Sequence, residues 1–172
     1  MVTSKELAAA AVQYAIGEIG VTEDAARTNK GEAKKYQDAV GLPKNEGYAW
    51  CMAFVYWCYM RACMQYKVSN PVVKTAGVME CYRLTPYLKK TVEQIRANPK
   101  LLAPGDQFIM KIGTAGLGHT GIIEKVVVNG ANITLHTIEG NTNDEGSRDG
   151  YEVCRRQRKL TDANMHGFIL YN

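Results

Sequence analysis

The chain has 172 residues, of which 21 are Lys or Arg and 17 are Asp or Glu, so its net charge at pH 7 is +4. A chain of this length can bury a full core, and we expect residues 1–172 to form a single domain. The mild positive charge suits an acidic surface such as a cell wall, whereas a nucleic-acid-binding protein would carry a denser basic stripe. The most basic segment, residues 155–159, is predicted to be the solvated edge of a strand, and we expect no nucleic-acid partner.

The number and spacing of the cysteines indicate the redox environment in which the chain folds. There are five, and they are Cys51, Cys58, Cys63, Cys81 and Cys154. An odd number without closely spaced pairs argues against a disulfide framework and against a zinc ribbon or finger. Three of them fall in one apolar segment, where a reduced cysteine behaves as a small hydrophobe. We therefore expect folding in a reducing cytosol, with no metal and no other cofactor.

The N-terminal segment predicts a helix and not a targeting signal. Gln13, Tyr14 and Glu18 interrupt residues 7–20, so this stretch fits neither the core of a signal peptide nor a membrane span. We expect the protein to be made in the cytoplasm, without membrane insertion, and to reach any external target by release or delivery. The helix is predicted over residues 4–19, with Thr3 or Ser4 as its cap.

Further helices are predicted up to about residue 100. A helix over residues 31–40 ends at Gly41. Residues 51–66 are apolar nearly all round, which is typical of a central, buried helix. One or two more helices are expected within residues 70–100, where Thr85-Pro86 and Asn98-Pro99 mark boundaries.

The pattern changes to strands after Pro104-Gly105-Asp106. Strands are predicted over residues 107–112, 118–128, 133–139, 151–158 and 167–171, with a hairpin turn at Asn129-Gly130. Helices first and an antiparallel sheet afterwards define an α+β protein, in which the helix that carries Cys51 packs on the C-terminal sheet.

Cys51 is the candidate nucleophile. It stands at the predicted start of a helix, directly after a loop, where the helix dipole and unpaired N–H groups favour a thiolate. The alternative is a buried structural thiol, which suits Cys58 and Cys63 well. The backbone N–H of Cys51 could also donate to an oxyanion.

Two histidines are candidates for the base. His119 begins a predicted strand between Gly118 and Thr120, and His136 lies within the next strand, whereas His166 looks peripheral. Spacing along the chain does not choose between His119 and His136, because the members of a triad are neighbours in space only.

Glu139 and Asn141 flank Gly140 on one face of a predicted strand, and either could orient an imidazole on the neighbouring strand. A strict two-residue turn at Asn129-Gly130 would set His119 opposite Gly140 and turn Glu139 and Asn141 to the other face. Catalysis therefore requires a register shifted by one residue, through a longer loop or a bulge, and we predict that shift.

Four segments in this order resemble a known family. They are residues 50–55 (WCMAFV), 104–106 (PGD), 118–123 (GHTGII) and 138–142 (IEGNT). The chain is similar in these segments to CHAP-domain cysteine amidohydrolases, within the broader NlpC/P60-like, papain-like group, and the likeness extends over nearly the full chain.

The resemblance implies a role for each residue of the candidate site. Cys51 would be the nucleophile, His119 the general base and acid, Glu139 the group that orients His119, and Asn141 a fourth polar member. We also expect Trp50 and Gly118 to contact the substrate.

The implied substrate is bacterial peptidoglycan, cleaved at an amide bond through an acyl-enzyme by a monomer. An N-acetylmuramoyl-L-alanine amidase is favoured slightly over a stem or cross-bridge endopeptidase. Such a protein would act as a phage lysin or a secreted effector, although 172 residues leave no room for a separate wall-binding domain.

Several expectations depart from that family or compete with it. Many relatives carry a calcium loop before the cysteine helix, but residues 23–27 (EDAAR) lack alternating oxygen ligands, and we predict no calcium. The alternatives are a non-catalytic wall-binding module and an amidase acting on an amide outside the wall. A structural metal site made of Cys51, Cys81 and His119 is less favoured, because no pair of these has the usual ligand spacing.

Overall fold

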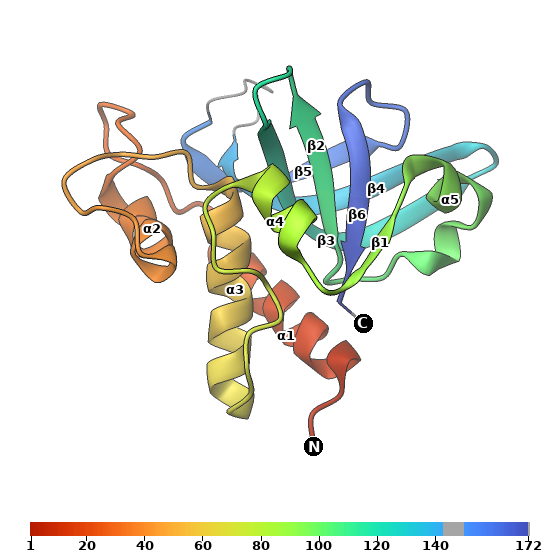
Figure 1. The fold of residues 1–172 in the computed structure, drawn as a ribbon, viewed down its shortest axis with the longest axis horizontal. Helices are drawn as coiled ribbons and strands as arrows, with labels where there is room; N and C mark the ends of the chain where they lie inside the picture. Colours follow the sequence, from red (N-terminus) through yellow and green to blue (C-terminus); the bar gives the residue numbers. More distant parts are fainter. Residues whose placement is uncertain (143–149, 172) are drawn as a thin grey trace.

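The helices lie mainly in the first half of the chain. The computed structural model describes residues 1–142 and 150–171. The helices are α1 (Ser4–Gly17), the 3₁₀ turn η1 (Gly31–Ala33), α2 (Lys34–Val40), α3 (Cys51–Tyr66), α4 (Val78–Leu84), α5 (Val92–Ala97) and the 3₁₀ turn η2 (Pro99–Leu101). Figure 1 shows α1, α2 and α3 gathered on one side of the molecule.

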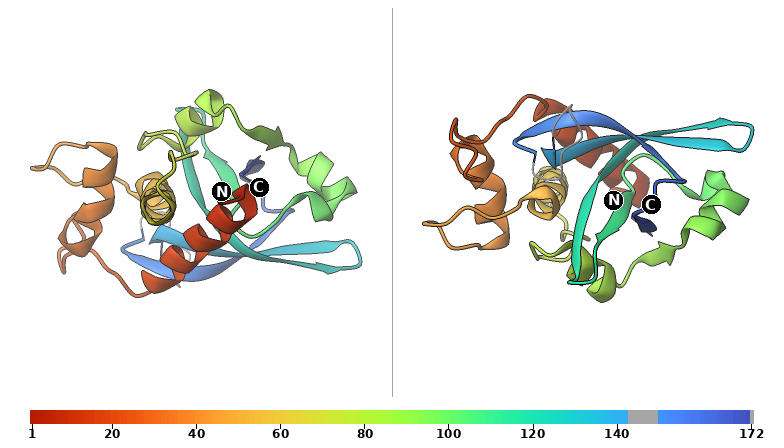
Figure 2. Two further views of the ribbon diagram at one scale, coloured as in Figure 1. Left: turned by 90° about the horizontal axis from the view of Figure 1, so that it is seen from below. Right: turned by 90° about the horizontal axis from the view of Figure 1, so that it is seen from above.

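The strands form one antiparallel sheet. Within the described residues, six strands follow the order β1-β6-β2-β3-β4-β5. They are β1 (Leu88–Lys90), β2 (Gln107–Ile112), β3 (Leu117–Asn129), β4 (Asn132–Thr142), β5 (Glu152–Lys159) and β6 (Met165–Leu170). The long β3–β4 hairpin extends away from α3 in both views of Figure 2. The prediction of an α+β protein with helices first and an antiparallel sheet afterwards is confirmed.

Most element boundaries follow from local chemistry. Thr3 caps α1 through a capping box with Glu6. Gly41 ends α2 in the left-handed region, with φ of 85°. The predicted helix over residues 51–66 coincides with α3, and its first three turns are largely buried. The short strand β1 was not predicted, because its three residues pair with distant β6 and carry no alternating pattern of their own.

The core occupies both faces of the sheet, as alternation along the strands requires. On one face Ile109, Ile122 and Ile138 belong to the apolar cluster that includes the buried side of α3. On the other face Phe108 and Phe168 belong to a second cluster that includes Ile95 of α5. Helix α3 is thereby fixed against β3 and β4, the strands that carry the candidate site.

Candidate active site

Cys51 is the first residue of α3; its thiol is free, and the residue as a whole is 5 % exposed. No side chain of the described residues caps this helix, so the N–H groups of its first turn remain available to a negative charge beside them. Cys58 and Cys63 also lie on α3, and burial raises the pKa of both thiols. That burial supports the interpretation of those two cysteines as packing residues.

His119 lies on β3, near the end of the sheet where α3 begins. Its Nε2 is 2.6 Å from Oε2 of Glu139. Burial by itself lowers the pKa of His119, but hydrogen bonds to Cys51 and Glu139 and the charges of these two groups raise that pKa to about 9. Because Nε2 is engaged by Glu139, Nδ1 is the ring nitrogen left for Cys51. His136 pairs with Lys125 and Gln157 farther along the hairpin, so it is His119 that meets Cys51.

A β-bulge places His119 and Glu139 on the same face of the sheet. Near the turn, Asn129 pairs with Asn132, so the turn is one residue later than predicted, at Gly130-Ala131. The register then shifts between Ile123 and Lys125, which leaves Glu124 as the extra residue on β3.

Beyond this bulge Ile122 pairs with Ile138, and the same register continued sets Gly121 opposite Glu139 and His119 opposite Asn141. The predicted one-residue shift is therefore confirmed, although the predicted position of the turn was wrong. Without the shift, the imidazole and the carboxylate would lie on opposite faces of the sheet.

Glu139 is fully buried, and its carboxylate accepts hydrogen bonds at both oxygens. Oε1 accepts from the Thr137 hydroxyl at 2.5 Å and from Nε of Arg158 at 2.9 Å. Oε2 accepts from Nη2 of Arg158 at 2.6 Å and lies against His119. Burial alone would raise the pKa of Glu139, but the hydrogen bonds and charges of His119 and Arg158 lower it to about 2.

Asn141 joins the end of β4 to the start of α3. Its backbone has a positive φ of 56°, a conformation that Asn tolerates better than most residues, and the β4–β5 register shifts there. The side-chain Oδ1 accepts a hydrogen bond from the Trp50 N–H at 3.4 Å. The contact with Trp50 uses only Oδ1, so it does not engage the side-chain NH₂ group. Asn141 also lines the cleft beside Cys51.

A small cleft of about 80 Å³ opens over these groups. It is lined by Ala49, Cys51, Ile112, Leu117, Gly118, His119 and Asn141. The cleft therefore lies where β2 and β4 end, β3 begins and α3 starts. Gly118 lies at the cleft as expected, and its contact with a substrate stays a prediction.

Trp50 does not line the cleft, and its contact with a substrate stays a prediction. The indole is fully buried and stacks on the Tyr36 ring at 5.2 Å. Its Nε1 donates a hydrogen bond of 2.8 Å to Oε1 of Glu23. These contacts therefore fix the residue that directly precedes Cys51, and the Trp50 side chain has no exposed surface.

Glycines allow these elements to approach one another. A Cβ on Gly140 would lie 2.5 Å from the Trp50 ring and 2.8 Å from Cβ of Phe54. A Cβ on Gly121 would lie 2.7 Å from Cγ of Glu139. The absence of a side chain at Gly140 lets the start of α3 pack closely against β4. The absence of a side chain at Gly121 leaves room for the Glu139 side chain beside His119.

Three contributors escaped the sequence analysis. Arg158 was taken for part of a solvated strand edge, whereas its side chain is 17 % exposed and bonded to Glu139. Neither Thr137 nor Glu23 was singled out. One physical signal was available, because a buried carboxylate requires hydrogen-bond donors. Cys154 pairs with Glu139, and strand alternation puts Arg158 on the same face as Cys154, so Arg158 could reach the Glu139 carboxylate.

The residues considered for metal binding are engaged in other ways. Glu23 accepts from Trp50 at one oxygen and from the Asn29 N–H, at 2.8 Å, at the other. Cys81 lies beside Gln107 in the core, so the structure does not bring it to Cys51 and His119. In the described part of the chain, no group of three or more His, Cys, Asp or Glu side chains is arranged to hold a metal ion.

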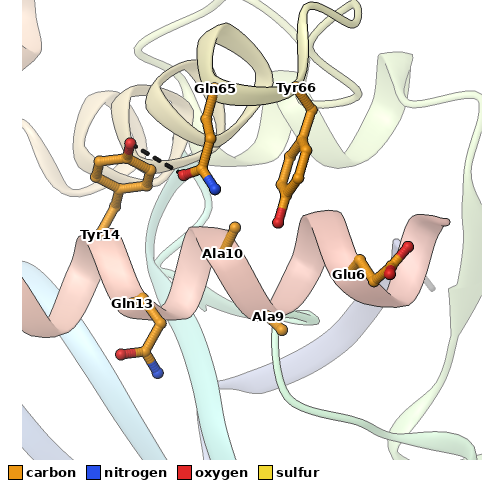
Figure 3. Close-up of a pocket in the computed structure, with 7 residues that line it drawn as sticks. All are labelled: Glu6, Ala9, Ala10, Gln13, Tyr14, Gln65 and Tyr66. Atoms are coloured by element: carbon orange, nitrogen blue, oxygen red, sulfur yellow. Dashed lines mark hydrogen bonds between the residues drawn. The ribbon is translucent and has the colours of Figure 1, made fainter. Parts of the chain in front are cut away.

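A wider hollow of about 440 Å³ lies elsewhere, between α1 and the last turn of α3 (Figure 3). It is lined by Glu6, Ala9, Ala10, Gln13, Tyr14, Gln65 and Tyr66. The Tyr14 hydroxyl donates to Oε1 of Gln65 at 3.2 Å across it. This lining contains neither a thiol nor an imidazole, so the hollow does not compete with Cys51 and His119 as a site for acyl transfer.

A thiol at a helix start, an imidazole beside it and a buried carboxylate behind the imidazole form the arrangement of a cysteine hydrolase. The chain belongs to the CHAP-domain family, whose model matches residues 43–141, a range that contains Cys51, His119, Glu139 and Asn141. CHAP domains are generally amidase or peptidase domains, and the family implies a peptidoglycan substrate. No curated protein and no solved structure matches the chain significantly. Within the described residues, no helix is long and apolar enough to cross a bilayer.

Proposed function

We propose that this protein is a cysteine-dependent peptidoglycan hydrolase that cleaves an amide bond through an acyl-enzyme. The observation that carries the proposal is that Cys51 and His119 line the same cleft, while Nε2 of His119 lies 2.6 Å from the buried carboxylate of Glu139. Each group has the chemistry of its assigned step: a thiol as nucleophile, an imidazole as base and acid, and an ionised carboxylate that fixes the imidazole.

The first half-reaction forms a thioester. His119 takes the proton of Cys51, and the thiolate sulfur attacks the amide carbonyl carbon. The carbonyl oxygen becomes an oxyanion, which accepts hydrogen bonds from the backbone N–H of Cys51 and from the side-chain NH₂ of Asn141. When the oxyanion collapses, the C–N bond breaks and His119 gives its proton to the leaving amine.

The second half-reaction releases the acid. A water molecule enters where the amine has left, and His119 removes one of its protons as the oxygen attacks the thioester. Collapse of this second intermediate breaks the C–S bond and restores the thiolate beside the imidazolium. Glu139 accepts from Nε2 of the ring throughout, so Nδ1 stays directed at the reacting atoms.

We further propose that residues 1–172 act as one catalytic domain with the papain-like arrangement of NlpC/P60 enzymes. Helix α1, which precedes the matched residues 43–141, shares a core with α3. Strand β5, which follows them, supplies Arg158 to Glu139. The parts outside the family match thus support the site that lies within it.

The bond we favour is the one between the glycan lactyl group and the first alanine of the stem, which would make the protein an N-acetylmuramoyl-L-alanine amidase. A stem or cross-bridge endopeptidase uses the same chemistry. Digestion of purified peptidoglycan by the wild type and by Cys51→Ala, with fragments identified by mass spectrometry, separates the two. Intact stem peptides freed from glycan indicate an amidase, and cleaved stems or cross-bridges indicate an endopeptidase.

The matched control is Cys58→Ala, which removes a buried thiol of the same helix that lies in the apolar core. We expect it to yield the wild-type fragments. If the wild type releases no product that depends on Cys51 from several wall types, the protein is either a wall-binding module or an amidase for an amide outside the wall. A pull-down with insoluble peptidoglycan then distinguishes these two.

A further inference from the structure

Arg158 makes a bidentate contact with the carboxylate of Glu139. Its Nε lies 2.9 Å from Oε1 of Glu139, and its Nη2 lies 2.6 Å from Oε2. The Thr137 hydroxyl and Nε2 of His119 occupy the remaining positions on the same two oxygens. Four donor atoms from three side chains therefore surround one fully buried carboxylate, which fills its usual capacity as an acceptor.

The contact differs from an ordinary surface ion pair. Arg155, on the same strand, makes a similar contact with Glu124, with Nε to Oε2 at 2.9 Å and Nη2 to Oε1 at 2.9 Å. The Arg155 side chain is 53 % exposed, whereas that of Arg158 is 17 % exposed. Solvent screens the first pair, whereas the second acts in a medium of low dielectric constant, where its charge has a much larger effect on its neighbours.

Arg158 and His119 compete for the same oxygen. Both lie 2.6 Å from Oε2 of Glu139, and an imidazolium there faces the permanent charge of the guanidinium. The titratable groups around this carboxylate include Cys51 of α3, His119 of β3, Cys154 and Arg158 of β5, and Asp162 in the turn after β5. Arg158 therefore offsets the negative charge of Glu139, so that the pair acts on His119 as a nearly neutral acceptor.

We propose that Arg158 is a positioning residue of the reaction, which fixes the Glu139 carboxylate towards His119 and keeps the imidazolium able to release its proton. This inference rests on the proposed function, because the proton in question is the one given to the leaving amine. An unshared buried carboxylate would hold the imidazolium too firmly and would be free to rotate away from Nε2. The family match ends at residue 141, before Arg158.

The test that needs no substrate is the NMR titration of the His119 ring in a Cys51→Ala background, which removes the coupled thiol. Arg158→Gln should raise the pKa of His119 by roughly one unit, because a like charge at this distance is lost. Arg158→Lys, which keeps the charge, should return the titration towards that of the parent. The matched control, Arg155→Gln, should leave it unchanged.

The kinetic arm uses a soluble muropeptide and the chain with Cys51 intact. Arg158→Gln should lower kcat on the order of 10- to 100-fold with little change in KM, and should move the alkaline limb of the pH profile upward. A folded Arg158→Gln protein with the parent's His119 titration and wild-type kcat would overturn the proposal. If Arg158→Gln does not fold, a wild-type kcat in Arg158→Lys overturns the proposal, because an ammonium group cannot make the bidentate contact with Glu139.

The two arms separate this inference from the proposed function. If the wild type lacks activity that depends on Cys51, the proposed function fails, and the His119 titration still tests the effect of Arg158 on the imidazole. If the wild type is active and the titration does not respond to Arg158→Gln, the inference about Arg158 fails alone.

Discussion

Gly140→Ala tests the close approach that sets Cys51 against the sheet. The added Cβ would lie 2.5 Å from the Trp50 ring and 2.8 Å from Cβ of Phe54, whereas ordinary contact begins at 3.4 Å. The Trp50 ring is stacked on Tyr36 and bonded at its nitrogen, so it cannot move aside alone. The start of α3 must therefore shift by up to about 1 Å, and overpacking of this kind costs about 1–3 kcal/mol.

The expected result is a lower thermal midpoint together with lower activity. For a domain of this size, a loss of about 2 kcal/mol lowers Tm by roughly 4–8 °C. A displacement of the Cys51 sulfur by about 1 Å can lower kcat on the order of 100-fold. Differential scanning calorimetry and muropeptide hydrolysis measure the two effects.

The matched control is Gly17→Ala at the end of α1, where an added Cβ meets nothing within 4 Å. That change should leave activity intact and leave stability unchanged or slightly higher. A Gly140→Ala protein with wild-type stability and wild-type kcat would refute the argument that this approach positions the nucleophile.

Three further perturbations follow from the same geometry. Trp50→Phe leaves one oxygen of the buried Glu23 unpaired and should cost about 1–3 kcal/mol in urea unfolding at unchanged KM; a raised KM at unchanged stability would mean that Trp50 contacts substrate after all. Deletion of Glu124 removes the unpaired residue of the bulge but keeps Lys125 opposite His136 and Ile123 opposite Thr137, so His119 should stay on the face of Glu139 and activity should remain within about tenfold of the wild type; a folded deletion variant without activity would contradict the register argument. Because the pKa of Glu139 is lowered to about 2, its ionised form contributes stability that is present above pH 4.5 and is lost as pH falls towards 2. Because the pKa of His119 is raised to about 9, its protonated form contributes stability that is complete below pH 6.5 and is lost as pH rises through 9. The free energy of unfolding should therefore be greatest between these limits and fall by up to roughly 3 kcal/mol at either extreme, whereas His119→Gln should flatten the profile and an equally steep profile in that variant would count against the pair.

Local patterns predicted the elements that carry the site. The apolar run of residues 51–66 predicted α3 at its observed bounds, because a helix surrounded by core must be apolar on nearly every side. Strand alternation predicted that Glu139 and Asn141 share a face. It also showed that His119 could join them only if the register shifted, and the bulge at Glu124 supplies that shift. The position of the bulge could not be predicted, because it depends on which cross-strand pairs pack best.

The partners of the site residues were harder to predict, because they depend on long-range contacts. Trp50 is buried by Tyr36 and bonded to Glu23, which lie 14 and 27 residues earlier in the chain. Arg155 and Arg158 look alike in the sequence, and only the pairing of β5 with β4 separates the exposed arginine from the buried one. A basic strand edge is usually solvated, and here one of its members completes the site.

The most direct test of the central claim is the rate at which iodoacetamide modifies Cys51 at pH 6, with peptide mapping to resolve the five cysteines. In the wild type, His119 lies beside Cys51 and can hold the proton that the thiol gives up, so Cys51 should react at least roughly tenfold faster than in His119→Ala. The other four cysteines are not among the residues that line the cleft, and they serve as the internal reference in both proteins. Equal rates of Cys51 modification in the wild type and His119→Ala would contradict the claim that these two residues form the reactive pair.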